Sequence, residues 1–202
     1  MAQIYPTKAN LLASKKSLEL AQMGYELMDQ KRNILVREMM RLVDNASSIR
    51  EEIDNVYKKA YHYLRLANTT IGDCESFAHA VPIDLSLSIN FKSVMGVEIP
   101  QTSIGESQLQ PYFGFHHTNS YLDMAYAAFI EAKELTVSLA EIESGVYRLA
   151  DSIKKTRKRA NALNNIIIPR FRETVKYITD ALDEKEREDY SRLKVIKNKK
   201  ES

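Results

Sequence analysis

Apolar residues recur at alternating spacings of three and four over two long stretches of this chain, and this repeat constrains the fold more than any other feature. The first stretch runs from residue 4 to residue 67, and the second from residue 121 to residue 167. The few polar members of the repeat are Thr7, Ser14, Arg32 and Thr156. A 3.5-residue repeat held over many heptads is typical of helices that supercoil around each other. The first stretch alone would form a helix of roughly 90 Å, so the sequence predicts a rod.

Prolines and capping residues set the expected boundaries. Pro6 and Thr7 precede the first repeat and predict a helix start near Thr7 that continues to about residue 80. Ser120 and Asp123 resemble a capping box, which predicts a second helix from about residue 119. Pro169 should kink that helix, because the apolar positions beyond it shift to a new register. These positions are Phe171, Val175, Ile178 and Leu182.

The middle segment, residues 81–118, changes character. Apolar and polar residues alternate from Ile83 to Phe91, which predicts a strand buried on one face. Residues 95–99 predict a second strand ended by Pro100, and residues 101–118 read as a loop. Charge is sparse here, so we expect this hairpin to dock on a partner. The residues assigned to this docking cap are Leu85, Leu87, Ile89, Phe91, Val97 and Ile99.

The sequence therefore predicts a mainly α fold: a long antiparallel two-helix coiled coil with a small β-hairpin and loop cap between the helices. We expect one elongated domain over residues 1–202, with both termini together at the tip opposite the hairpin. A four-helix bundle is the alternative, but no loop signal interrupts either seam. Gly24 and Gly72 lie inside the first repeat, where each costs ~1 kcal/mol relative to alanine. Tolerated flexibility and close approach of another backbone both remain open for them.

Composition excludes several classes of function. The net charge of +2 argues against a general nucleic-acid binder. The lone Cys74 allows no internal disulfide and favours a reducing compartment. No stretch is apolar enough to span a bilayer or to act as a secretory signal. The chain lacks a GxxxxGK[ST] motif, and the adjacent His116 and His117 lack further ligands nearby. We expect no catalytic residues, no metal site and no cofactor.

Basic side chains form the sharpest charge feature. Five of the six residues from Lys154 to Arg159 are basic, which wraps charge around most of the helix and favours a surrounding acidic partner. An antiparallel pairing is expected to bring basic residues of the first helix near the same tip. The predicted basic collar comprises Lys8, Lys15, Lys16, Lys31, Arg32, Lys154, Lys155, Arg157, Lys158 and Arg159.

Two terminal runs carry a family resemblance. The run PTKANLLASKKSLELAQMGYELMDQKRNIL and the run RANALNNIIIPRFRETVKYITDALDEKEREDYSRLKVIK resemble the two signatures of the D subunit of V-type and A-type rotary ATPases. The resemblance is carried most clearly by Pro6, Thr7, Gly24, Asn161, Leu163, Pro169, Glu186 and Arg187.

The resemblance implies a rotor component of the central stalk that transmits torque and has no catalytic residues of its own. It implies partners in a hexamer of nucleotide-binding A and B subunits, which the basic collar would face, and in the small central-stalk F subunit and the funnel-shaped C subunit. The chain would couple ATP synthesis or hydrolysis to proton or sodium transport. It would lie on the cytoplasmic side of the membrane and contact the membrane only indirectly.

Two other classes of function remain as alternatives. A helical-hairpin chaperone or scaffold of the prefoldin kind would expose apolar residues at its helix tips, whereas both tips here are charged. A nucleic-acid-binding helical arm would need a larger basic excess and salt-sensitive binding.

Overall fold

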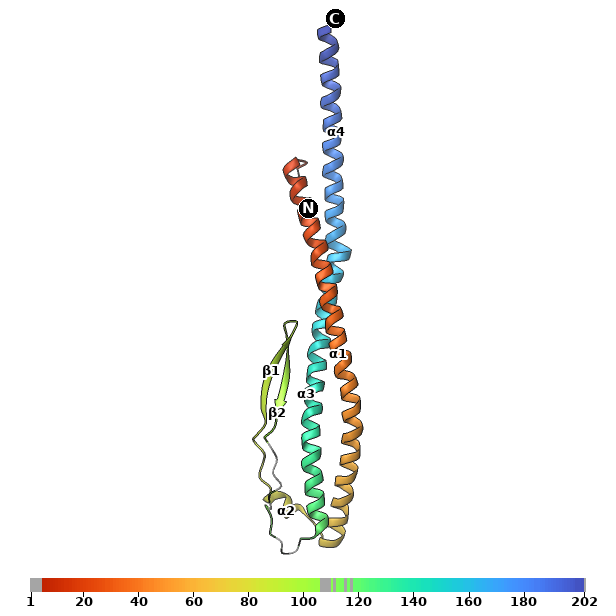
Figure 1. Cartoon of the computed structure of the whole chain (residues 1–202). Coiled ribbons are helices and arrows are strands. Elements are labelled where there is room, and N and C mark those ends of the chain that lie inside the picture. Colours follow the sequence, from red (N-terminus) through yellow and green to blue (C-terminus); the bar gives the residue numbers. More distant parts are fainter. Residues whose placement is uncertain (1–4, 106–109, 111, 115, 117, 202) are drawn as a thin grey trace. The chain divides into compact units, whose positions relative to one another are not determined.

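The chain is mainly helical, with two long helices packed antiparallel and a two-stranded hairpin between them in the sequence (Figure 1). The computed structural model describes residues 5–105, 110, 112–114, 116 and 118–201. Its elements in order are α1 (Lys8–Ile71), α2 (Glu75–Ala80), β1 (Ser88–Val94), β2 (Val97–Ser103), α3 (Ser120–Ala162), the π-helix η1 (Leu163–Ile167) and α4 (Ile168–Glu201). The predicted fold class is confirmed, and the four-helix bundle is excluded because α1 runs through Gly24 without a break.

Contacts divide the chain into two compact units. The terminal unit comprises Met1–Asn33 and Lys154–Ser202, and the hairpin unit comprises Ile34–Ile153. The hairpin unit contains the second part of α1, the first part of α3, α2 and both strands. The terminal unit contains the start of α1, the end of α3, η1 and α4.

In the hairpin unit, the repeat positions form the seam between α1 and α3. Leu35, Ala60 and Leu149 are fully buried in it. Every repeat position of α1 in this unit, from Leu35 to Ala67, is buried or half-buried. The predicted seam is therefore confirmed along this part of α1, because an apolar stripe of this period has only one face to bury.

Capping by polar side chains explains where the long helices begin. The Thr7 hydroxyl oxygen accepts a hydrogen bond from the Asn10 N–H at 3.2 Å, as an N-cap does. Asn119 caps α3 in the same way, since its side-chain oxygen accepts the Leu122 N–H at 3.1 Å. The helix starts are as predicted, but the capping residue of α3 is Asn119 and not Ser120.

The end of α1 differs from the prediction. The helix stops at Ile71, and Gly72 follows with a φ of +96°. Residues other than glycine rarely adopt this conformation, and it is the usual way in which a helix is terminated. Gly72 is therefore a stop signal and not a tolerated interior glycine. The expected continuation to residue 80 is wrong, because Glu75–Ala80 forms the separate helix α2.

In the terminal unit, a π-helix moves the seam by one residue. The N–H of Ile168 bonds to the carbonyl of Leu163, five residues earlier. Because of the extra residue, the seam position after Leu163 is Ile168, which is only 4% exposed. The Ile167 side chain stays outside the seam and is 37% exposed. The prediction that Ile167 lies in the seam is wrong. The predicted shift to Phe171, Val175, Ile178 and Leu182 is confirmed, since Ile178 is fully buried and the other three are half-buried.

The helix also continues through Pro169 and beyond residue 197. Pro169 is the second residue of α4, directly after the π-turn, where its missing N–H is accommodated by the widened hydrogen-bond pattern. The Lys8 ammonium lies 3.0 Å from the Glu186 carboxylate. Residues of α4 after Glu186 therefore extend past the start of α1, and all of them from Arg187 to Lys200 are exposed.

The two strands differ from the predicted ones at both ends: β1 begins later than the alternation of apolar and polar residues predicts, and β2 continues past Pro100. Val94 pairs with Val97 across a two-residue turn, and Ser88 pairs with Ser103. Met95 and Gly96 in the turn both have positive φ, 51° and 75°, as a type I′ turn requires. Residues 82–87 have no regular structure, so the predicted strand start at Ile83 is wrong. Pro100 does not end β2 but lies within it, opposite Phe91.

The hairpin does not cover the turn between the helices, as a cap would. It lies alongside α3 (Figure 1). A Cβ atom added to Gly145 of α3 would lie 3.0 Å from Ile99 Cγ2 and 3.3 Å from Leu42 Cδ1. The glycine therefore allows β2 and α1 to approach the same turn of α3.

Candidate functional site

The residues predicted as a docking cap fall into two groups. Leu85, Leu87, Ile89 and Phe91 are exposed, by 89%, 47%, 56% and 58%. Val97 and Ile99 are half-buried. The predicted strand with one buried face is therefore wrong for this chain, because Ile89 and Phe91 of β1 remain more than half exposed. Apolar side chains this exposed along one continuous segment are the kind of surface that proteins use for contacts.

Side chains of α3 bind the hairpin through polar contacts. Glu141 Oε2 accepts hydrogen bonds from both the backbone N–H and the hydroxyl of Thr102, each at 2.7 Å. Arg148 donates to the backbone carbonyl of Glu98 at 3.2 Å. The Arg148 guanidinium also lies 5.3 Å from the centre of the Phe91 ring, as in a cation–π contact. These contacts fix the hairpin on one side of α3.

Sequence reasoning missed these α3 residues. Glu141 and Arg148 look like ordinary surface charges of a helix. Gly145 carried a usable signal, since it is the only glycine of α3 and a helix interior disfavours glycine. An isolated glycine at that position points to close approach of another segment.

An ion pair joins the segment before β1 to α3. The Lys133 ammonium lies 2.6 Å from the Asp84 carboxylate, and the Ser86 N–H donates to the same carboxylate at 2.9 Å. The hydrogen bond from Lys133, followed by those from Ser86, holds the pKa of Asp84 well below its usual range. Asp84 thus stays charged at any physiological pH.

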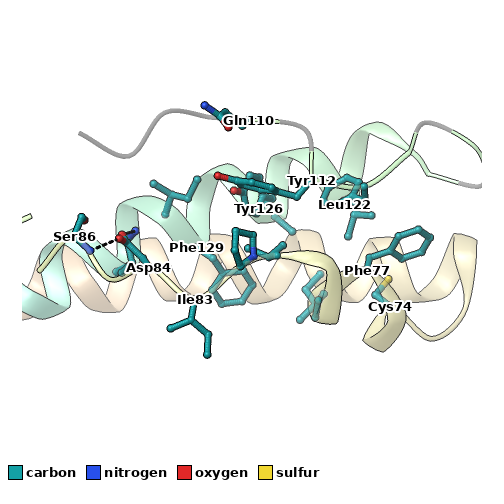
Figure 2. A pocket seen from close by; sticks show the side chains of 18 of the residues that line it. Cys74, Phe77, Ile83, Asp84, Ser86, Gln110, Tyr112, Leu122, Tyr126 and Phe129 are labelled. Carbon is teal, nitrogen blue, oxygen red and sulfur yellow. Dashed lines mark hydrogen bonds and ion pairs between the residues drawn. The ribbon is translucent and has the colours of Figure 1, made fainter. Parts of the chain in front are cut away.

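A cavity of about 700 Å³ lies next to this ion pair (Figure 2). Asp84 and Ser86 lie at one end of the cavity, and Cys74 and Phe77 lie at the other (Figure 2). Its further lining is mainly apolar and includes Leu64, Val81, Ile83, Phe113, Leu122, Ala125, Phe129 and Ile130. The volume is in the range of small-molecule sites. Its polar groups are those of the ion pair and of Tyr112, Tyr126, Ser86 and Gln110.

Two titratable side chains of this cavity have raised pKa values. Burial raises the pKa of the Cys74 thiol, and the neighbouring Asp73 charge raises it further. Burial also raises the pKa of Tyr126, with Tyr112 adding to the shift and Lys133 opposing it. A thiol with a raised pKa is a weak nucleophile at neutral pH. The cavity can therefore hold an apolar group, and the raised pKa of Cys74 does not activate this thiol as a nucleophile.

The residues of the predicted basic collar all belong to the terminal unit, but they do not form one ring. Gly24 lies next to Leu163, with 3.9 Å from an added Cβ to Leu163 Cδ1. This antiparallel register places Lys31 and Arg32 opposite the basic run of residues 154–159. Lys8, at the other end of this part of α1, is about 35 Å away by helix rise. The basic groups therefore follow the length of the unit, with Lys15 and Lys16 in between.

Some of these charges have partners within the unit. Lys8 pairs with Glu186, and the Arg32 guanidinium lies 2.7 Å from Asp29. The side chains of residues 154, 155 and 157–159 are exposed, while Thr156 between them is only 5% exposed in the seam. The basic run therefore presents charge to the outside while its one small polar residue packs against α1.

The signature positions of the resemblance have identifiable local roles. Thr7 caps α1 directly after Pro6. Gly24 lies at ordinary contact distance from the Leu163 side chain at the start of the π-turn, so the space around it does not require a glycine. Asn161 and Arg187 are exposed. Pro169 follows the π-turn, and Glu186 pairs with Lys8.

Neither a metal cluster nor a membrane-spanning helix is found in the described part of the chain. Among those residues, no group of three or more histidine, cysteine, aspartate or glutamate side chains is arranged to hold a metal ion. His117 lies outside the described residues. No described helix is long and apolar enough to cross a bilayer.

Comparison with known proteins gives a consistent result along nearly the whole chain. The family model that describes the D subunit of ATP synthase matches residues 10–198. The D subunit of the V-type ATP synthase of Thermotoga neapolitana is 43% identical over 198 residues, covering 97% of this chain and 98% of its own. The D subunit of the A-type ATP synthase of Pyrococcus furiosus is 36% identical over 200 residues, covering 96% of this chain and 94% of its own. That of Methanopyrus kandleri is 36% identical over 202 residues, covering 98% and 87%.

Proposed function

The chain belongs to the D-subunit family of V-type and A-type ATP synthases, and from this premise we propose that it is the rotor component of the central stalk of such a complex. In this role it transmits torque between a hexamer of nucleotide-binding A and B subunits and the ion-translocating ring in the membrane. ATP is made or hydrolysed in the hexamer, and this chain contributes neither catalytic residues nor a cofactor. The transported ion is a proton or a sodium ion.

The unbroken helix seam is the observation that carries this proposal. Each repeat position of α1 from Leu11 to Ala67 is buried or half-buried. Twisting two helices about each other must shear such a seam along its whole length. Close-packed interiors resist this kind of deformation because there is little free volume into which side chains can move. A pair of helices packed in this way is suited to carry torque.

The charge and exposure of the terminal unit support its placement inside the hexamer. The basic residues that extend from Lys8 to Arg32 and from Lys154 to Arg159 would face acidic surfaces of the A and B subunits. Coulomb attraction depends weakly on direction, so it holds a rotor within a ring while allowing rotation. The exposed residues of α4 after Glu186 would reach furthest into the ring.

The hairpin unit would then lie toward the membrane and contact the small central-stalk F subunit and the funnel-shaped C subunit. Its exposed apolar residues, Leu85, Leu87, Ile89 and Phe91, support a role in such contacts. The chain itself would lie on the cytoplasmic side of the membrane and reach the membrane only through these partners.

Truncation of α4 tests the rotor role. The complex is purified with the full chain or with a chain ending at Arg192, and ATP hydrolysis and ATP-driven ion uptake are measured in the same vesicles. We expect the truncation to lower the number of ions moved per ATP while hydrolysis continues. A matched control replaces Leu193, Val195 and Ile196, which are 53–64% exposed, by serine. It keeps the helix length, so it separates a loss of length from a loss of apolar surface.

Two results would contradict the rotor proposal. One is ATP hydrolysis by the isolated chain. The other is an unchanged ratio of ions to ATP in a complex that lacks this chain altogether.

A charge variant tests the contact with the hexamer. Lys154→Gln with Arg157→Gln removes two exposed charges of the basic run, and Lys58→Gln with Lys59→Gln removes two exposed lysines of the hairpin unit as a control. We expect the first pair to weaken binding to isolated hexamer more than the second, with the gap closing as salt is added. If both pairs of substitutions weakened binding equally, the hexamer would not bind this basic run specifically.

A further inference from the structure

The two outer edges of the hairpin differ in what covers them. Across a two-residue turn, the pair Val94–Val97 and every second pair beyond it exchange backbone hydrogen bonds. The backbone groups of Glu98, Pro100 and Thr102 therefore point away from β1, along the outer edge of β2. The contacts of Glu98 and Thr102 place this edge against α3.

Residues of α3 bind two of the backbone groups on this edge. Glu141 accepts the Thr102 N–H, and Arg148 donates to the Glu98 carbonyl. Pro100 has no N–H to satisfy. Gly145 lies between these two side chains in the sequence and allows Ile99 to approach closely. One face of α3, defined by Glu141, Gly145 and Arg148, thus acts as a dock for one strand edge.

Apolar burial contributes little to this docking. Pro100 is the only buried residue of the segment 83–105, all of which the structure describes. The other large apolar side chains of the segment are half-buried or exposed, with Ile83 and Leu85 at 86% and 89%. Polar contacts are exchanged for contacts with water when they break, so their net contribution is small compared with that of a packed core. The polar contacts that hold the hairpin can be replaced by contacts with water, whereas the apolar contacts in the seam between α1 and α3 cannot.

Backbone continuity allows the hairpin to move as a unit. Residues 82–87 have no regular structure, and the ion pair of Asp84 with Lys133 fixes this segment at its base. The strands beyond it are paired with each other, and they contact α3 through the outer edge of β2 and through the Phe91 ring, which lies against Arg148. Segments with few buried apolar contacts are the ones that open locally.

We propose that the hairpin is a strap that docks on and releases from α3 as a unit, while α1 and α3 stay packed. Glu141 and Arg148 are positioning residues that hold the docked state, and Gly145 provides the space for it. Release exposes the outer edge of β2 and the face of α3 at Gly145. This inference concerns the hairpin unit alone and does not depend on the rotor role.

Exchange of backbone amide hydrogens in the full ¹⁵N-labelled chain tests the strap. The Thr102 amide reports on docking, the Gln101 amide on pairing within the hairpin, and the Leu149 amide on the packed helix. With Glu141→Ala we expect the Thr102 amide to exchange at least tenfold faster and the Leu149 amide to change less than twofold. Glu141→Gln, which keeps the size of the side chain, should have an intermediate effect. Glu131→Ala, at an exposed glutamate of α3 outside the dock, serves as the control and should change neither amide.

A disulfide between the hairpin and α3 tests the same equilibrium between docked and released hairpin by favouring the docked state. Ile99→Cys with Gly145→Cys, in a Cys74→Ser background, places two thiols where β2 lies close to the backbone of α3. We expect the oxidised form to slow exchange of the Thr102 amide at least tenfold relative to the reduced form. Unchanged Thr102 exchange in Glu141→Ala would overturn the proposal, as would equal exchange in the oxidised and reduced forms. Faster exchange of the Thr102, Gln101 and Leu149 amides together would also overturn it, because the strap would then not move separately.

Discussion

The π-turn before Pro169 leads to a prediction that separates two possible causes of the turn. In a regular α-helix, the seam after Leu163 would pass through Ile167, Arg170 and Thr174. With one extra residue it passes through apolar side chains that include Ile168 and Ile178, which are 4% and 0% exposed. Each residue rotates a helix by about 100°, so a single residue decides which set is buried.

Seam burial is large enough to maintain the π-turn without the proline. Burying an isoleucine contributes about 1.5–3 kcal/mol, so Ile168 and Ile178, less the burial that Ile167 would gain in the regular register, favour the shifted register by about 1.5–3 kcal/mol. Pro169→Ala should therefore keep the π-turn and change the free energy of unfolding by less than about 1 kcal/mol. Deleting Ile166 should remove the extra residue, keep the same apolar seam and place Pro169 inside a regular α-helix, at a cost of about 3 kcal/mol.

The double variant completes the test. Deleting Ile166 together with Pro169→Ala should restore the free energy of unfolding to within about 1 kcal/mol of the unaltered chain, a coupling of about 3 kcal/mol between the two sites. Urea unfolding of the full chain, followed by circular dichroism at the helix band, measures all four forms. Deletion of the exposed Lys176 is the matched control, because it turns Ile178 out of the seam and Pro169→Ala cannot rescue it. A double variant as unstable as the Ile166 deletion alone would refute the reasoning.

Four further predictions follow from single residues. Gly72→Ala should lower the free energy of unfolding by about 1–2 kcal/mol in thermal denaturation, because its φ of +96° strains any residue with a Cβ. Leu149→Ala should cost about 2–5 kcal/mol in urea unfolding, because Leu149 is fully buried in the seam. The Lys133 contact lowers the pKa of Asp84 from its ordinary value of 3.8, so the folded state releases this proton more readily than the unfolded state. The difference in the free energy of unfolding between the unaltered chain and Asp84→Asn should therefore be constant near neutral pH and shrink as the pH falls below 3.8. Unfolding measured over a series of acidic pH values would show this. Cys74 should react slowly with iodoacetamide at neutral pH in the folded chain and quickly in urea, because burial raises the pKa of its thiol.

The helix seam could be predicted from the sequence because it depends on one simple physical rule. An apolar residue every 3.5 positions can be buried only on one face of a helix, and the positions from Leu11 to Ala67 follow that rule. The change of register after Pro169 could be predicted for the same reason. Its mechanism could not, because a kink at Pro169 and a π-turn at residues 163–167 both shift the seam.

The boundaries of the middle segment could not be predicted because they depend on pairing and not on periodicity. The residues before Ser88 alternate as well as those of β1, but β2 ends at Ser103 and leaves them without a partner. Pro100 was expected to end a strand. It is accommodated because its missing N–H points to the outer edge of β2, where no ladder hydrogen bond is needed.

The contact between the hairpin and α3 was the feature that the sequence predicted least well. Its residues are charged or small and carry no periodic signal, and Glu141 became visible only through its two hydrogen bonds to Thr102. Gly145 was the exception, since an isolated glycine within a long helix asks for a structural reason. Long-range polar contacts of this kind depend on tertiary geometry, which a local pattern does not encode.

The different chemistry of the two contact types has a consequence for how substitutions should behave. The seam is made of apolar side chains, many of them alanines such as Ala60 and Ala132, which let the helix backbones approach closely. Removing volume there leaves cavities and lowers the stability of the whole unit. The dock at Glu141 is polar and partly open to water, so its loss should change the position of the hairpin and leave the stability of the helix pair nearly unchanged. A chain that must stay rigid along its helices while one segment moves needs this separation, because a strap held by deep apolar burial could open only by disrupting the seam itself.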